Sequence, residues 1–427
     1  MTRKLDAAAI TRRSVFWLGT GLGVGALVGC SSSSTASPAA SASGSASAST
    51  SAAAAGNTKL SAGTYSATFT SSQSGPGGGG GTQTLSGAYL VDGIAATIDG
   101  GTWASTTADQ NVLLVVNGGS LTLKNATITK SGDSTNEDAC NFYGLNSAIL
   151  VVGDKSSATV TNCTVTTASE GSNALFAAGS GSLAANTVTI ATTKNSSRGL
   201  DATYAGIIMA QNMTIDTKGA HCACVATDRG NGTIKVTGTN KLTAAGDGSP
   251  CIYSTGDISV SGATGSAATS QTMVIEGQNS ITLTDSTLTS TGTAGMMIYQ
   301  SFSGDAANSD ATSSKATMTI ADSTITTSGS VPMIYVTNTT CDVKVTGATL
   351  THPASTPLLS LAEDTWGTSG SNGGHATVTF SGCTLSGAMT AGSSSSATVA
   401  LTNGTKLTGT TSGSVTVTKN GTSSMAA

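Results

Sequence analysis

The chain has 427 residues, of which only 9% are charged and 4% aromatic, while 54 are glycine. So few aromatic side chains exclude a core built on large aromatic anchors, and a formal net charge of −4 excludes a general affinity for the phosphate backbone of nucleic acids. The composition is uniform after about residue 60, which favours one extended domain over several unrelated ones.

The first segment, residues 1–29, has the features of an export signal. Arg12 and Arg13 form a twin-arginine pair ahead of a short apolar stretch, and the sequence LVGC ends at Cys30. This arrangement resembles a bacterial twin-arginine signal that ends in a lipoprotein box. The stretch is shorter than the ~20 apolar residues of a membrane span, which argues against a transmembrane helix. The resemblance implies a lipid on Cys30 and a location on the outer side of the cytoplasmic membrane, at the cell surface.

Residues 30–57 consist almost entirely of serine and alanine after Cys30. Such a segment has too little apolar surface to form a core, so we expect a flexible tether with a coil-like reach on the order of 30 Å. The folded domain is then residues 58–427. Without the signal the chain keeps 14 of its 18 basic and 21 of its 22 acidic residues, so its formal net charge becomes −7.

A short phrase recurs through the folded domain. Each copy has an apolar residue, a spacer, then Asn, Asp or Gly, another spacer and Thr-apolar-Thr, as in LTLKNATIT at 121–129 and IADSTIT at 320–326. The Asn, Asp or Gly positions are Gly100, Asn125, Asn162, Asn212, Asp285, Asp322, Gly347 and Gly382, with degenerate copies near Asn186, Thr239 and Gly262. Most neighbouring marks lie 23 to 27 residues apart, which is typical of a solenoid with one unit per turn.

A second apolar segment lies between the copies of the phrase. These segments are Leu113–Val116, Ile149–Val152, Leu175–Ala178, Ile207–Ala210, Cys224–Thr227, Ile252–Thr255, Met273–Glu276, Ile298–Ser301 and Ile334–Thr337. No amphipathic helical period accompanies them. Two or three short strands per unit without helices predict an all-β fold, a parallel β-helix of roughly a dozen turns.

The phrase itself explains how such a coil bends and packs. Gly, Asn and Asp adopt the left-handed conformation more easily than other residues, so the marked positions are expected to form a stack of sharp turns. The Thr-apolar-Thr that follows alternates across its strand, with the apolar residue inward and the hydroxyls outward. The expected inner ladder is Ile128, Val165, Ile215, Leu288, Ile325, Leu350 and Leu385.

The phrase and the coil length resemble the right-handed parallel β-helix of pectate lyases. The signal, the tether and the Ser/Thr/Gly-rich repeats resemble bacterial adhesin-like surface proteins, as do blocks such as SRGLDATYAGIIMA at 197–210 and DGSPCIYSTGDISV at 247–260. The resemblance covers residues 85–420 and implies the fold. It implies no single activity, because this superfold carries lyases, hydrolases, adhesins and passive spacers.

Charged side chains are concentrated at or beside the ends of successive strands in the middle of the chain. Stacking would gather them into a negatively charged groove with two arginines. These residues are Arg198, Asp201, Asp228, Arg229, Asp247, Asp257, Glu276 and Asp305. Such a groove favours a polar glycan or Ca²⁺, although no cofactor is required. The simpler alternative is that each carboxylate pairs with an arginine or caps a turn.

The resemblance to pectate lyases implies that Arg198 or Arg229 abstracts a proton beside carboxylates around Ca²⁺. A pKa above about 12 weighs against arginine in that role. An enzyme needs two or three carboxylates that converge on a water-filled cleft, whereas a binding protein needs only spread contacts. Convergence of Asp201, Asp228 and Asp257 therefore discriminates a lyase or hydrolase from a binding protein.

Other residues are candidates for recognition. Tyr253, Tyr299 and Tyr335 share one expected register and form either an exposed strip for sugar stacking or a wall of packed rings with surface hydroxyls. The segments 130–147, 302–315 and 361–376 are insertions between turns, and insertions of this kind often contact partners. The expected recognition residues in these loops are Asp133, Glu137, Asp138, Tyr143 and Trp366.

The cysteines invite a metal site, since Cys222 and Cys224 form a C-x-C pair beside His221. A zinc site needs about four ligands, usually from two such pairs, and the other thiols show no matching spacing. We therefore predict no metal site and interpret the seven cysteines after Cys30 as buried, unpaired small hydrophobic residues.

The sequence predicts an adhesin-like binding or display protein at the cell surface. Its expected partner is a glycan or another cell-surface ligand. The protein contacts the membrane only through the N-terminal lipid and has no nucleic-acid partner, and its oligomeric state is left open. The first alternative is a polysaccharide lyase or hydrolase. Minor alternatives are a passive stalk and an ice-binding protein, the latter because outward threonines resemble an ice-binding surface that insertions here would interrupt.

Overall fold

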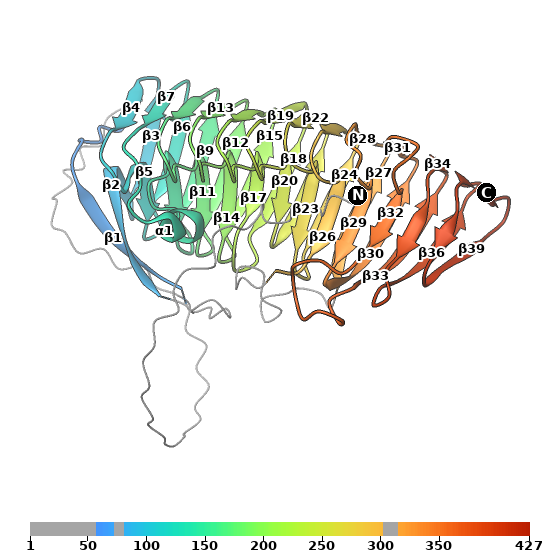
Figure 1. The fold of residues 1–427 in the computed structure, drawn as a ribbon. Coiled ribbons are helices and arrows are strands. Elements are labelled where there is room, and N and C mark those ends of the chain that lie inside the picture. Colours follow the sequence, from blue (N-terminus) through green and yellow to red (C-terminus); the bar gives the residue numbers. More distant parts are fainter. Residues whose placement is uncertain (1–56, 72–80, 302–314) are drawn as a thin grey trace, which may run out of the picture.

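A computed structural model describes residues 57–71, 81–301 and 315–427. Arg12, Arg13, Cys30 and Asp305 lie outside the described residues, as does nearly all of the expected tether. The described residues form a coil of short strands with a single short helix (Figure 1). The predicted all-β parallel β-helix is confirmed, with about 13 turns counted on its second sheet.

The strands of the coil form three long sheets and one short one. The first sheet contains β1 Tyr65–Thr70, β2 Thr82–Asp92, β5 Gln110–Val116, β8 Ile149–Val152, β11 Leu175–Ala178, β14 Leu200–Thr203, β17 Val225–Thr227, β20 Ile252–Ser254, β23 Met273–Glu276, β26 Met296–Tyr299, β29 Ile334–Thr337, β32 Leu359–Leu361, β35 Met389–Ala391 and β38 Thr411–Ser412. The second contains β3 Ala95–Asp99, β6 Ser120–Lys124, β9 Ser157–Thr161, β12 Ser182–Asn186, β15 Ile207–Gln211, β18 Thr233–Thr237, β21 Asp257–Ser261, β24 Ser280–Thr284, β27 Ala316–Ala321, β30 Thr339–Thr346, β33 Gly374–Ser381, β36 Ser396–Thr402 and β39 Val415–Lys419.

The third sheet contains β4 Thr102–Ser105, β7 Thr127–Lys130, β10 Thr164–Thr167, β13 Thr189–Thr192, β16 Thr214–Thr217, β19 Asn240–Ala244, β22 Ala263–Ala267, β25 Thr287–Ser290, β28 Thr324–Thr327 and β31 Thr349–Thr351. The short sheet contains β34 Thr384–Ser386, β37 Lys406–Thr408 and β40 Ser424–Ala426. Each central turn adds one strand to the first, second and third sheets in that order, as β8, β9 and β10 do. Neighbouring turns pair in parallel, whereas β1 pairs antiparallel with β2 at the N-terminal end.

The stack of left-handed turns is present. Asn125, Asn162, Asn212, Asp285 and Asp322 have φ values between 47° and 55°, and four glycines continue the series. The glycines are Gly100, Gly262, Gly347 and Gly382. A left-handed residue therefore precedes most strands of the third sheet, as the repeated phrase predicted.

At the two degenerate copies near Asn186 and Thr239 the left-handed residue is the neighbouring one. The left-handed residue is Thr187 rather than Asn186, because Ile190 must pair with Val165 to fill the core, and that register moves the bend one step along the chain. Beside Thr239 the left-handed conformation is taken by Gly238, which has no Cβ and adopts it without strain.

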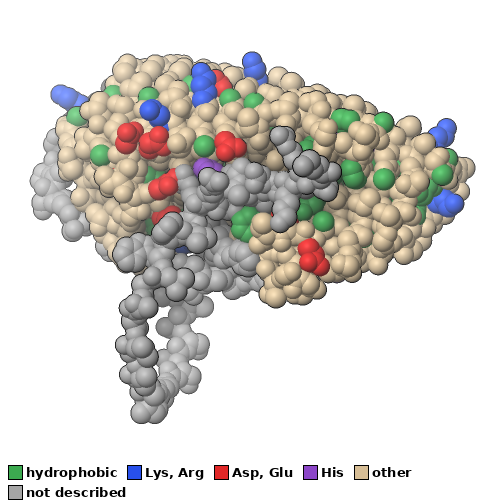
Figure 2. All heavy atoms as spheres, viewed as in Figure 1, with side chains coloured by type: hydrophobic (Ala, Val, Ile, Leu, Met, Phe, Trp, Pro, Cys, Tyr) green, Lys and Arg blue, Asp and Glu red, His purple; other side chains and the backbone are tan. Residues whose placement is uncertain are grey.

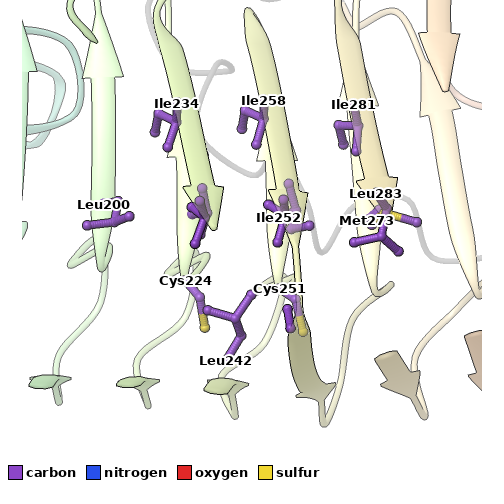
Figure 3. Packing of buried hydrophobic residues seen from close by; sticks show 14 of the residues in the cluster. Leu200, Cys224, Ile234, Leu242, Cys251, Ile252, Ile258, Met273, Ile281 and Leu283 are labelled. Atoms are coloured by element: carbon purple, nitrogen blue, oxygen red, sulfur yellow. The ribbon is translucent and has the colours of Figure 1, made fainter. Parts of the chain in front are cut away.

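The inner ladder of the third sheet holds the core together. Val165 pairs with Ile128 and Ile190, and the column continues without a break through Ile215 and Leu242. Gly265 follows Leu242 and interrupts the aliphatic column, which Leu288, Ile325 and Leu350 continue, while Leu385 pairs with Leu407 in the short sheet. Burial of each such side chain contributes about 1.5–3 kcal/mol, so many small contributions add up along the coil. Figure 3 shows Leu242 of this column with Cys224 and Cys251 beside it, together with core residues of the first and second sheets.

One expected strand was assigned to the wrong sheet. Residues 207–210 belong to β15 of the second sheet, and the first sheet is continued instead by β14. The outward side chains of β15 are Ile207 and Met209, which are 39% and 47% exposed. They are the exposed large hydrophobic residues of the described part of the chain, and they matter for the site below.

The prediction of a fold without helices was also wrong, because the insertion after β7 contains helix α1, Glu137–Tyr143. The Asn136 side chain accepts a hydrogen bond from the Ala139 amide at 3.0 Å, and Gly144 ends the helix with a φ of 72°. These are ordinary helix caps. The buried face of α1 packs with Phe176 on the outer face of the first sheet. Within the described residues no helix is long and apolar enough to cross a membrane.

Candidate functional site

A buried polar cluster lies between α1 and the first sheet. Arg198 Nη2 lies 2.5 Å from Asp228 Oδ2, and Arg198 Nη1 lies 3.6 Å from Asp201 Oδ2. The same Nη1 donates to Asn141 Oδ1 on α1 at 2.6 Å. Arg229 is placed separately, with its guanidinium 3.7 Å above the ring of Phe142. Two carboxylates therefore share the Arg198 guanidinium, which also holds α1 through its hydrogen bond to Asn141.

Burial and neighbouring charges shift the pKa values of Asp201 and Arg198 for different reasons. Arg198, Asp201 and Asp228 are all buried. Burial and the neighbouring Asp228 carboxylate raise the pKa of Asp201 well above its ordinary value, even though Arg198 acts in the opposite direction. Burial opposes the charge of Arg198, but the two carboxylates outweigh it and raise the pKa of the guanidinium. The Ala202 backbone amide also favours the charged form of Asp201, but it does not offset the effect of burial.

Replacing Asp201 by asparagine is therefore expected to leave the free energy of unfolding at pH 7 unchanged or raised by about 1 kcal/mol, because a poorly paired buried charge is removed. A raised folded-state pKa means that Asp201 opposes folding above that pKa and ceases to do so below about pH 4, where both states are protonated. Urea denaturation at pH 7 and pH 4 checks this. A loss above 2 kcal/mol at pH 7 would show that Asp201 is a required partner of Arg198.

A second polar cluster surrounds Glu276 at the end of β23. The fully buried Glu276 carboxylate accepts hydrogen bonds from the Tyr253 and Ser301 hydroxyls, and from the Tyr299 hydroxyl at 2.8 Å. Burial, followed by the Glu276 charge, raises the pKa of Tyr253, and the charge of Asp228 raises it further. The Glu276 and Arg198 clusters are therefore close enough to interact electrostatically.

The three predicted tyrosines do not share one register. Tyr253 and Tyr335 lie in the same outward column of the first sheet, separated by Val274 and Met297, whereas Tyr299 pairs with Glu276 two residues further along the strands. Tyr299 and Tyr335 are buried and Tyr253 is half-buried. The Tyr335 hydroxyl donates to Asp364 Oδ2 at 2.7 Å. These rings form a packed wall rather than an exposed strip. The register predicts the face of the sheet on which a side chain lies, but not how deeply that side chain is buried.

The predicted polar groove is only partly assembled. Asp201 and Asp228 converge on Arg198, but Asp257 begins β21 on the second sheet, is exposed and accepts the Ser280 hydroxyl at 2.5 Å. Asp247 is exposed in the turn before β20. The strand ends that carry these residues belong to different sheets, so stacking does not bring them together. In the described residues no group of three or more His, Cys, Asp or Glu side chains is placed to hold a metal ion such as Ca²⁺.

The predicted recognition residues of the loops have structural contacts. Asp133 Oδ1 accepts the Glu170 amide at 3.0 Å, and Glu137 accepts the Ser196 hydroxyl. The Tyr143 ring centroid lies 5.8 Å from that of Phe69. Trp366 packs against Tyr299 with ring centroids 5.5 Å apart, and Asp138 is exposed in the first turn of α1. Acidic side chains gather toward the α1 half of the coil in the face that Figure 2 shows.

The cysteines follow the prediction. The seven described cysteines are free and buried, and burial raises the pKa of Cys251 to about 12. Cys163 and Cys383 donate to backbone carbonyls within the core. These thiols are packing residues, and a thiolate nucleophile is disfavoured at such a pKa.

The outward threonines of the third sheet form a longer array than the sequence indicated. The ten strands pair without a break, because the insertions leave the coil elsewhere. One column runs from Thr102 to Thr349 and is interrupted by Lys241. The next column contains Ala191 and Asp216. The strands of the array therefore pair without interruption, but its outward side chains near the centre include alanine, aspartate and lysine as well as threonine.

The outer face of the second sheet has an open groove of about 500 Å³. It is lined by Thr159, Thr161, Ala184, Ala185, Asn186, Met209, Ala210, Gln211, Lys235 and Thr237. Two outward columns border it, one running from Thr159 through Ala184 and Met209 to Lys235, the other from Thr161 to Thr237. The small Ala184 beside Thr159 and Met209 leaves the depression. Four strands at about 4.8 Å spacing give a groove about 14 Å long, parallel to the coil axis.

None of the groove residues was predicted as a site. The signal was present in β15, where apolar Ile207 and Met209 alternate with Ile208 and Ala210. A strand that is apolar on both faces indicates either full burial or an exposed apolar patch. The neighbouring strands β12 and β18 alternate normally, and comparison with them would have favoured the exposed patch.

Comparison with known proteins adds little to this geometry. No family model matches the chain, and no curated protein matches it. Among solved structures the chain is similar to the catalytic domain of a GH87 alpha-1,3-glucanase in complex with tetrasaccharides. The two share 11% sequence identity and align with a TM-score of 0.33 over 79% of this chain and 61% of that one, less than two thirds of its length. A likeness at this level carries no argument about activity.

Proposed function

We propose that this protein is an exported, lipid-anchored, adhesin-like surface protein that binds a linear glycan in the groove on its second sheet. The observation that carries the proposal is the groove itself, an open depression with an exposed methionine and unengaged amide and hydroxyl groups. Its direction along the coil suits a polymer better than a compact ligand. The twin-arginine pair and Cys30 support the anchoring part of the proposal.

The chemistry of the groove suits a sugar chain. Met209 offers an apolar surface to the C–H face of a sugar ring, and Gln211 has both a donor and an acceptor for ring hydroxyls. Gln211 and Met209 are exposed, and no hydrogen bond links the side-chain amide of Gln211 to another described residue. Asn186 Oδ1 already accepts from Asn212 Nδ2 at 3.2 Å, which fixes that amide in place. The strand ladders hold these groups rigid, so binding orders few side chains.

The double variant Met209→Ser, Gln211→Ala is expected to weaken binding to the recognised glycan at least tenfold, because it removes both the apolar contact and the amide. The midpoint of thermal unfolding should stay within about 2 °C, since both side chains are exposed. A panel of polysaccharides, then calorimetric titration with the best binder, measures this. The matched control is Thr282→Ala, which lies in the same outward column on β24. Equal binding by all three proteins would overturn the proposal.

Catalysis is the second candidate, favoured by the convergence of Asp201 and Asp228 on Arg198 near Glu276. Those carboxylates are buried, with Asp228 only 3% exposed, whereas a hydrolase or lyase needs them in contact with its substrate. The same polysaccharides, incubated with and without Ca²⁺, are expected to release no product. Calcium-dependent release that Asp228→Asn abolishes would make catalysis the better assignment.

A further inference from the structure

The charges around the groove follow a definite order along the coil. Lys235 is the single charged residue among those that line the groove, and it lies on β18 at one end. Lys124 on β6 stands next to Thr161 at the other end. Both lysines are exposed. The groove is therefore framed by two cations on a chain with more acidic than basic residues.

The nearest carboxylates of this face lie beyond the lysines. Asp99 precedes Lys124 in its column, and its Oδ1 accepts Asn125 Nδ2 at 2.7 Å. Asp257 follows on β21, next to Thr233, and accepts the Ser280 hydroxyl. No carboxylate lines the groove. An anionic group is thus attracted between the lysines and repelled outside them.

From this order we infer that the ligand of the groove is an anionic linear glycan. Lys235 and Lys124 form ion pairs with its carboxylate or sulfate groups. This inference rests on the proposed function and deepens it. The backbone positions of the two lysines are separated by four strand steps, about 19 Å, so one polymer chain can contact both side chains while its neutral face lies on Met209. Each lysine is exposed, so its contribution is the modest one of a solvated ion pair, about twofold to fivefold in affinity, and it falls with salt.

The test uses one glucan backbone in neutral, carboxymethylated and sulfated forms, titrated into the full-length chain. We expect both anionic forms to bind at least fivefold more tightly than the neutral form at low salt, and the difference to shrink in 0.5 M NaCl. Lys235→Gln should weaken binding of the anionic forms about threefold without changing the neutral form. Lys344→Gln, an exposed lysine in the same outward column on β30, is the matched control and should have no effect.

The failures of the two proposals are distinguishable. Equal affinity for neutral and anionic forms, with Lys235→Gln inert and the Met209→Ser, Gln211→Ala variant still defective, would overturn the anionic ligand and leave glycan binding intact. Loss of the anionic preference in Lys344→Gln as well as in Lys235→Gln would show a general surface-charge effect and would overturn it too. Preference for one of the two anionic forms identifies whether carboxylate or sulfate is read.

Discussion

Replacing Arg198 by methionine is expected to lower the free energy of unfolding by about 3–5 kcal/mol at pH 7, because it removes the buried guanidinium that lies 2.5 Å from the Asp228 carboxylate and 3.6 Å from the Asp201 carboxylate. The variant also loses the 2.6 Å hydrogen bond to Asn141 on α1. Urea denaturation followed by circular dichroism measures the loss. Protection of the α1 amides against hydrogen exchange should fall further than protection of the β-strands, since the helix loses its anchor.

The deficit of the Arg198→Met variant is expected to depend on pH in a defined direction. Burial and the Asp228 carboxylate already raise the pKa of Asp201 in the parent protein, and loss of the Arg198 guanidinium, which acts in the opposite direction, raises it further. Protonation then relieves the penalty, so the difference from the parent protein should shrink as pH falls from 7 to 4. Lys218→Met is the control, since its 3.8 Å contact with Asp216 is exposed and contributes at most about 1 kcal/mol. A deficit that grows on acidification would contradict this account.

Gly246→Ala is expected to destabilise the coil by about 3 kcal/mol or more, because a Cβ at this position would lie 1.7 Å from the Gly219 carbonyl oxygen of the preceding turn. The obstacle is backbone, so no side chain can rotate away and the two turns must separate. The φ of Gly246 is not left-handed, so the effect is steric rather than conformational.

The matched control is Gly392→Ala, whose Cβ would meet Leu361 O at 3.6 Å, an ordinary contact. That variant should be neutral or stabilised by up to about 1 kcal/mol, because alanine restricts the unfolded chain. Urea and thermal denaturation of both variants compare the two. Similar stabilities for Gly246→Ala and Gly392→Ala would show that the turns are not in the close contact described.

Most of the fold could be predicted from the sequence because each turn repeats the same requirement. A bend needs a residue that tolerates the left-handed conformation, and the strand after it needs an inward aliphatic residue, so both recur in the chain. The errors arose where these requirements competed. At Asn186 the residue best suited to the bend lies one position from the one that core packing selects, and packing prevailed through Ile190.

The candidate site was less accessible to sequence analysis. Arg198 and Asp201 are three residues apart, and Asp228 lies about one turn further on, so their convergence could be predicted from the period. Asp257 is also about one turn further on, but it belongs to a different sheet, and no periodicity in charge reveals that difference. The groove was missed because residues 207–210 were predicted only as an apolar strand between copies of the phrase, and the pairing of β15 shows that Met209 faces outward.

The antiparallel β1 and the groove lie toward the same end of the coil, which has a mechanical consequence. If the protein is held through its N-terminal segment and pulled by a polymer between β9 and β18, tension crosses only the turns from β1 to β18 (Figure 1). In a stack whose turns contact only their neighbours, β21 and later strands then lie outside the path of the tension. They support the loaded turns only through contact with the adjacent turn. Rupture under force should therefore begin at the N-terminal edge, where Asn57 and Thr58 are bonded to β3 and β1 pairs antiparallel with β2, and shortening the coil from its C-terminal end should change the rupture force little.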